Sequence, residues 1–181
     1  MPTKLPFLPD EHQFAIALVA VTAAELDMTI EKLVYLMFGQ PDSITEFILK
    51  NLHANRIMDF LLTLFLARLP NYEGYLNELF ARIKTSRQDR NDLLHWLYDT
   101  SHKGDTIKIE DKRPFRHKPP REMTAGDIQV IADSLENCVD ELVEWMILHD
   151  WVHGHPLSDK PEQQPRPPNW ALPSKIRPPN T

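Results

Sequence analysis

Apolar residues recur at every third or fourth position through most of the first 150 residues, and this spacing limits the fold more than any other feature. It is the spacing of one buried face of an α-helix, and it differs from the strict alternation of a half-buried strand. Only 5 glycines occur among the 181 residues, which fits helices better than a turn-rich β-sandwich. The sequence therefore predicts an all-α fold, an up-down bundle of four to five helices.

The predicted helices end where glycine, proline or a change of pattern interrupts the spacing. We expect them at about residues 10–38, 54–69, 72–100 and 124–153, with a short helix that Asp42 or Ser43 caps and that ends at about Asn51. The buried face of the first is expected to comprise Phe14, Leu18, Val21, Leu26, Ile30, Leu33 and Met37. The last opens at Thr124, with Asp127 at its N3 position. A polar insertion at 101–122 precedes it, and its alternating residues 106–109 predict a short strand or hairpin arm.

Proline marks where the folded part ends. Eight of the 16 prolines fall in the last 28 residues, which lack the apolar content of a packed core. We therefore expect a helical domain at residues 8–153 and a Pro-rich, disordered tail at residues 154–181.

The single cysteine and the N-terminal apolar stretch indicate the compartment. Cys138 has no second cysteine with which to form an internal disulfide or a cysteine zinc site, as is usual in a reduced, cytosolic protein. The apolar stretch from Phe14 to Leu26 is shorter than the roughly 20 residues that span a bilayer. We expect a cytoplasmic protein with no membrane association.

An arginine interrupts the apolar stripe of the predicted helix at 72–100. This stripe comprises Leu76, Leu79, Phe80, Ile83, Leu94 and Leu97. Arg90 falls in phase with it, and an unpaired buried guanidinium would be very costly. Arg90 is therefore expected to be paired, or to face a cleft or a subunit interface. Asn91 and His95 are four residues apart and share a neighbouring face.

The string Arg90-Asn91-Asp92-Leu93-Leu94-His95 resembles the Arg-x4-6-His motif of the HEPN superfamily. Members of that family fold as bundles of four or five helices with the motif late in the chain, and they are often metal-independent ribonucleases, commonly toxins or antiviral effectors. The resemblance implies that Arg90, Asn91 and His95 are catalytic and that no cofactor or metal is used. It also implies an RNA substrate, a homodimer whose site forms between protomers, and an antitoxin partner protein.

The chemistry of these side chains suits RNA cleavage. Histidine titrates near neutral pH, so it can accept or donate a proton, and arginine presents a permanently charged fork to phosphate oxygens. Five residues along a helix correspond to about 140° of rotation between Arg90 and His95. One protomer therefore makes a poor site, and a two-fold homodimer would bring two copies of each residue to one cleft.

The charge distribution is compatible with such a substrate. The formal net charge of −6 argues against a protein that coats nucleic acid by charge alone. Residues 82–121, however, hold 11 basic and 6 acidic residues, whereas the rest of the chain holds 9 and 20. The expected RNA-binding residues in this segment are Lys84, Arg87, Lys103, Arg113 and Arg116. The alternative is a solvated loop whose charges only keep the protein soluble.

A second function, of a different class, fits the same residues. A non-catalytic interaction protein would keep the HEPN fold and use the bundle to dimerise or to bind a partner. In that case Arg90 would pair with Glu25, which interrupts the apolar face of the first helix, and His95 would be an interface residue. Glu25 is also the candidate to support Arg90 in an active site. Finally, His149 and His153 could chelate a metal, but the C-terminal end of an ordinary helix also favours histidine, and we expect no metal site.

Overall fold

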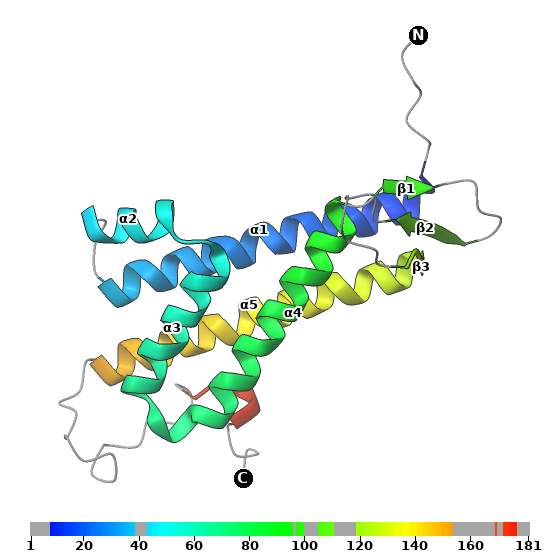
Figure 1. The fold of residues 1–181 in the computed structure, drawn as a ribbon. Coiled ribbons are helices and arrows are strands. Elements are labelled where there is room, and N and C mark those ends of the chain that lie inside the picture. Colours follow the sequence, from blue (N-terminus) through cyan, green and yellow to red (C-terminus); the bar gives the residue numbers. More distant parts are fainter. Residues whose placement is uncertain are drawn as a thin grey trace. The chain divides into compact units, whose positions relative to one another are not determined.

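The computed structural model describes residues 8–38, 43–95, 97–99, 105–110, 119–153, 169 and 172–176. Within these residues the chain forms five α-helices and a small sheet (Figure 1). The helices are α1 Asp10–Phe38, α2 Ser43–Asn51, α3 Ala54–Arg68, α4 Glu73–His95 and α5 Ala125–His153. The predicted all-α fold class is confirmed.

Three short strands form one antiparallel sheet in the order β1-β2-β3. They are β1 Leu97–Asp99, β2 Thr106–Glu110 and β3 Arg121–Thr124. The strand expected at 106–109 is confirmed as β2, and its Ile107 and Ile109 are buried. The helix expected to reach residue 100 ends at His95 instead, because Leu97–Asp99 pair with β2. Strand pairing with partners 9 to 13 residues away is not visible in helical periodicity.

Helix α5 begins where the sequence predicts, and a reciprocal cap holds its first turn. The Thr124 hydroxyl accepts a hydrogen bond from the Asp127 N–H at 3.1 Å, and the Asp127 carboxylate accepts one from the Thr124 N–H at 2.8 Å. These bonds satisfy backbone donors that the helix leaves without partners. The hydrogen bond from the Thr124 backbone, followed by the one from its hydroxyl, lowers the pKa of Asp127.

The described residues divide into two compact units, each with its own core. The first unit is built within Met1–Glu25 and Lys84–Glu136, and the second within Leu26–Ile83 and Asn137–Thr181. The boundaries fall inside α1, α4 and α5.

In the first unit, α1 turns a different face inward from the one that the sequence predicts. The buried apolar residues of this unit are Ala15, Val19, Ala23, Leu93, Ile107, Ile109, Ile128, Ala132 and Leu135. The predicted core residues Phe14 and Val21 are instead 70% and 56% exposed. Small alanines on the inward face let neighbouring elements approach closely, and this leaves the larger side chains outside.

The second unit follows its predicted stripes. Its buried apolar residues are Leu26, Ile30, Leu33, Val34, Met37, Ile57, Met58, Leu61, Phe65, Leu69, Leu76, Leu79, Phe80, Ile83, Cys138, Leu142, Trp145 and Leu148. Aromatic rings meet edge to face within this core, with 5.2 Å between the ring centres of Tyr72 and Trp145. The lone cysteine, Cys138, is buried and forms no disulfide.

Helix α1 as a whole is long and apolar enough to cross a membrane, although the stretch from Phe14 to Leu26 is not. Its 18-residue window has a mean hydropathy of 1.5, and 39% of that window is buried within the protein. A core helix of a soluble protein meets the same criterion, so this is weak evidence for a membrane span. The cytoplasmic location stays a prediction.

Within the tail expected to be disordered, a short segment has a defined structure. Leu172 and Pro173 lead into a single 3-10 turn at Ser174–Ile176, and Pro173 is buried. Residues 154–168, 170–171 and 177–181 lie outside the described residues. The domain boundary expected after residue 153 stays a prediction.

Candidate functional site

The predicted catalytic string occupies the last two turns of α4, in the first unit. Arg90 and Asn91 are half-buried, whereas Asp92 and Leu93 are buried, at 4% and 2% exposed. His95 is the last residue of the helix, and its side chain lies outside the described residues. The string therefore lies on a regular helix directly before β1.

A hydrogen bond and a buried side chain show how this part of α4 is rotated. The Ser86 hydroxyl is 2.7 Å from that of Ser134 on α5, and Leu93 is buried two turns later. Arg90 lies within about 60° of both around the helix axis. Its Nε atom is buried, and the residue has an interaction partner. The prediction that Arg90 lies in phase with buried residues agrees with this placement.

A different face of α4 gathers four polar residues in one stripe. Lys84, Arg87, Asn91 and His95 follow one another at steps of three and four, so their Cα positions lie within about 80° around the axis. The first three side chains are half-buried. Arg90 lies about 100° from Asn91, on the flank of this stripe. The side chains of two cations and an amide thus share one side of the helix, and the backbone position of His95 continues the stripe.

The other predicted RNA-binding residues cannot be placed, and one basic residue of the segment has another role. Lys103, Arg113 and Arg116 lie outside the described residues. Arg82 forms an ion pair with Glu141 in the second unit, so it does not extend the stripe. Glu25, the predicted support for Arg90, is exposed on α1, and its pairing with Arg90 stays a prediction.

Asp92 is the residue of the string to which the sequence assigned no role. Its carboxylate accepts a hydrogen bond from the Gln88 side-chain amide at 2.6 Å, one turn earlier. Because a buried carboxylate needs such donors, Asp92 helps to hold the turn that carries Arg90 and Asn91.

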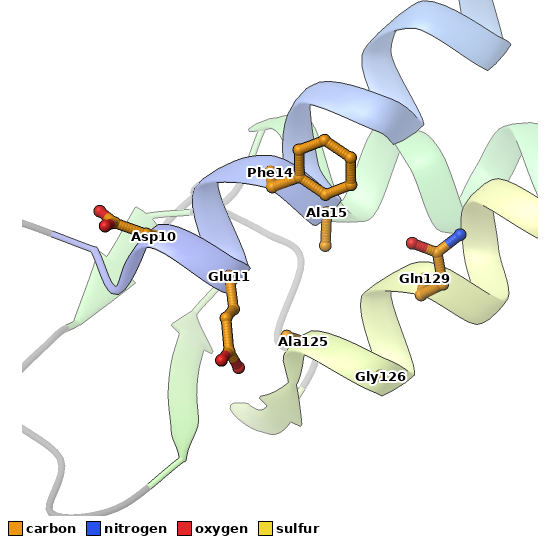
Figure 2. Close-up of a pocket in the computed structure, with 7 residues that line it drawn as sticks. All are labelled: Asp10, Glu11, Phe14, Ala15, Ala125, Gly126 and Gln129. Atoms are coloured by element: carbon orange, nitrogen blue, oxygen red, sulfur yellow. The ribbon is translucent and has the colours of Figure 1, made fainter.

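A groove lies at the N-terminal ends of α1 and α5, also in the first unit (Figure 2). Its volume is about 460 Å³, and it is lined by Asp10, Glu11, Phe14, Ala15, Ala125, Gly126 and Gln129. The lining residues include two acidic side chains and no basic one. Phosphate would be repelled here, so the groove is a poor RNA site.

The second unit contains a buried acid that sequence reasoning missed. Glu141 is 3% exposed, and Arg82 donates to both of its carboxylate oxygens, at 2.8 and 2.5 Å. The Tyr75 hydroxyl donates to Oε2 at 2.5 Å, and the Lys175 ammonium donates to Oε1. A signal for it was present, because Glu141 lies three residues after buried Cys138 and four before buried Trp145, in phase with the core.

These contacts set the protonation of the cluster. Burial alone would raise the pKa of Glu141, but hydrogen bonds from Arg82, Lys175 and Tyr75 lower it to about 2. Burial and the neighbouring carboxylate raise the pKa of Tyr75. At neutral pH the Glu141 carboxylate therefore stays ionised and the Tyr75 hydroxyl stays protonated. These groups are suited to stabilising the fold and not to proton transfer.

His149, which the sequence marks as a metal ligand candidate, has another contact in this unit. It is buried, and its Nε2 accepts a hydrogen bond from Arg68 at 2.9 Å. The side chain of His153 and all of His155 lie outside the described residues. Among the residues that the structure places, no group of three or more His, Cys, Asp or Glu side chains is arranged to hold a metal ion.

Comparison with protein-family models, with curated proteins and with solved structures gives no match for this chain. The resemblance to the HEPN superfamily therefore depends on the string from Arg90 to His95 and on the helical fold. It stays a prediction.

Replacing Glu141 with glutamine should lower the free energy of unfolding by about 2 kcal/mol near pH 7, because hydrogen bonds to a charged acceptor are lost in a buried site. The folded-state pKa of about 2 lies below the ordinary 4.5, so the ionised acid stabilises the fold above that value. This contribution is lost as the pH falls from 4.5 toward 2. Urea denaturation at several pH values measures the free energy of unfolding of both proteins. The difference between the wild-type protein and Glu141→Gln should become smaller in acid. The exposed Glu136→Gln is the control, and an equal deficit at every pH would contradict the assignment.

Proposed function

We propose that this chain is a metal-independent endoribonuclease of the HEPN type that acts as a homodimer. The observation that carries the proposal is the α4 stripe of Lys84, Arg87, Asn91 and His95, with Arg90 on its flank. Cations placed along a helix can position a phosphate backbone. The histidine at the end of the stripe supplies proton transfer where that backbone would lie.

In the proposed reaction, the His95 imidazole accepts the proton of a ribose 2′-hydroxyl, and the 2′-oxygen attacks the adjacent phosphorus. Arg90 donates hydrogen bonds to the phosphorane oxygens, where negative charge accumulates. Asn91 orients the phosphate or the imidazole. The bond from phosphorus to the 5′-oxygen breaks, and His95 of the partner subunit gives that oxygen a proton. The products are a 2′,3′-cyclic phosphate and a 5′-hydroxyl.

The need for a second protomer follows from helix geometry. Arg90 and His95 are about 140° apart on α4, so one copy presents them in different directions. The reaction also uses a proton acceptor and a proton donor, whereas each copy has one histidine in the string. A two-fold dimer supplies both. A toxin or defence role, an antitoxin partner and a cytoplasmic location belong to the same proposal.

The exposed face of α1 in the first unit is the surface that we assign to this dimer. It comprises Phe14, Ala17, Val21 and Ala24, all exposed, and no charged residue occurs between Glu11 and Glu25. These four residues have the steps of three and four of a helix–helix seam. In an antiparallel pair, Phe14 would meet Ala24 of the partner subunit and Val21 would meet the partner's Ala17. Large side chains would thus oppose small ones at each level, as close packing requires.

Purified protein should cleave single-stranded RNA in EDTA and leave 2′,3′-cyclic phosphate ends, identified by mass spectrometry of the products. His95→Ala should lower the rate at least about 100-fold, because the proton-transfer group is removed. His53→Ala changes an exposed histidine at the start of α3 and is the matched control. Cleavage undiminished by His95→Ala, or no cleavage of any RNA, would contradict the proposal.

Val21→Glu should weaken self-association at least about tenfold, since it places a charge in the seam. Sedimentation equilibrium measures the dissociation constant. Val143→Glu introduces the same charge at a valine of α5 that is 41% exposed, and it should leave the constant unchanged. Equal effects of the two variants would show that α1 is not the interface. A dimer that depends on Val21 but cleaves no RNA would instead favour the non-catalytic interaction protein.

A further inference from the structure

A short segment near the C-terminus is held on α5 by specific contacts. The Ser174 backbone N–H donates to the Glu144 carboxylate at 2.5 Å, and the Lys175 ammonium donates to Glu141. Pro173, one residue earlier, is buried. Three consecutive residues thus use three different kinds of contact: apolar burial, a backbone hydrogen bond and an ion pair.

The receiving surface is built by residues outside this segment. Glu141 is 3% exposed, and it is already bound by Arg82 and Tyr75 of α4. Those bonds fix the position of its carboxylate and keep it ionised. The Oε1 atom of Glu141 also accepts a hydrogen bond from the ammonium group of Lys175, whose side chain is half-exposed. Glu144 lies one helical turn further on, so both carboxylates lie on the same side of α5. A fixed, buried carboxylate facing an accessible cation is typical of a recognition site, because little must be ordered when the ligand binds.

We propose that Glu141 and Glu144 of α5 form a recognition site for a short linear segment in which lysine follows proline by two residues, and that this chain's own residues 172–176 occupy it. The proline, which is buried, limits the conformations that the free segment can adopt. Its fixed φ also suits the start of the 3-10 turn. The lysine supplies a compact ammonium group for Glu141.

Residues 172–176 occupy the site because they belong to the same chain. A segment on the same chain binds with an effective concentration in the millimolar range, so weak contacts suffice to fill the site. An isolated peptide must therefore be tested on a chain whose own segment has lost its contacts. The site shares no residue with the α4 stripe, so this proposal and the proposed nuclease can fail independently.

The test uses the full chain carrying Ser174→Pro, which removes the N–H donor, and Lys175→Ala, which removes the cation. A fluorescein-labelled peptide of residues 171–181 is titrated into this protein, and binding is followed by anisotropy. The wild-type peptide should bind about tenfold more tightly than the same peptide with Lys175→Ala, because a charged hydrogen bond is lost. Circular dichroism of each protein variant confirms that the helices are retained.

A second arm tests the receiving carboxylates. Adding Glu144→Gln to the test protein should weaken the wild-type peptide several-fold, whereas adding Glu136→Gln, an exposed glutamate elsewhere on α5, should not. Equal affinity of the two peptides, or no binding of the wild-type peptide at 1 mM, would overturn the proposal. Equal effects of the two glutamine substitutions would overturn the role of Glu144.

Discussion

The carboxylate of Glu141 cannot be buried without donors, and the second unit is organised around this requirement. Burying an ionised carboxylate costs several kcal/mol unless charges and hydrogen bonds replace the lost water, on the order of the whole stability of a domain. Arg82 and Tyr75 of α4 supply most of the replacement, and Lys175 supplies the rest. The same carboxylate thereby ties α4, α5 and a segment close to the C-terminus into one unit.

A related constraint governs the end of α4 in the first unit. Arg90 lies on the face that also carries buried Ser86 and Leu93, and its own side chain is half-buried. The polar stripe through Asn91 takes the neighbouring face of the helix. Strand β1 follows directly and ends the helix at His95, which sets where the stripe stops. The packing of Ser86 and Leu93 therefore sets the rotation of the helical turns that carry Arg90 and Asn91.

Helical periodicity was enough to predict the all-α class and to locate α1, α3 and α5, since each buries one regular face. It failed at residues whose placement depends on distant partners. Its size and apolar character predict a core position for Phe14, but the inward face of α1 here consists of Ala15, Val19 and Ala23, which permit close approach. Leu97 was assigned to a helix, but pairing with Glu110 draws it into a strand. Lys175 looked like part of a disordered tail, since nothing in its neighbourhood reveals a carboxylate 34 residues earlier.

The candidate site was only partly accessible to the same reasoning. Arg90 is a charged residue in phase with a core stripe, and Glu141 has the same relation to the core stripe of α5. Once the bounds of α4 are known, helix periodicity places Lys84 and Arg87 on the same side as Asn91. The net charge of the chain does not reveal this arrangement. Sequence could not assign a role to Asp92, because its burial depends on the fold around it.

The claim that two protomers share one site is tested most directly by mixing subunits. Wild-type and His95→Ala chains are co-expressed in known ratios, and RNA cleavage is measured in EDTA. If each cleft needs His95 from both chains, a mixture with equal amounts should retain about a quarter of the wild-type rate, since only wild-type pairs are active. A rate of about half, falling in proportion to the wild-type fraction, would show that each chain works alone and would contradict a shared site.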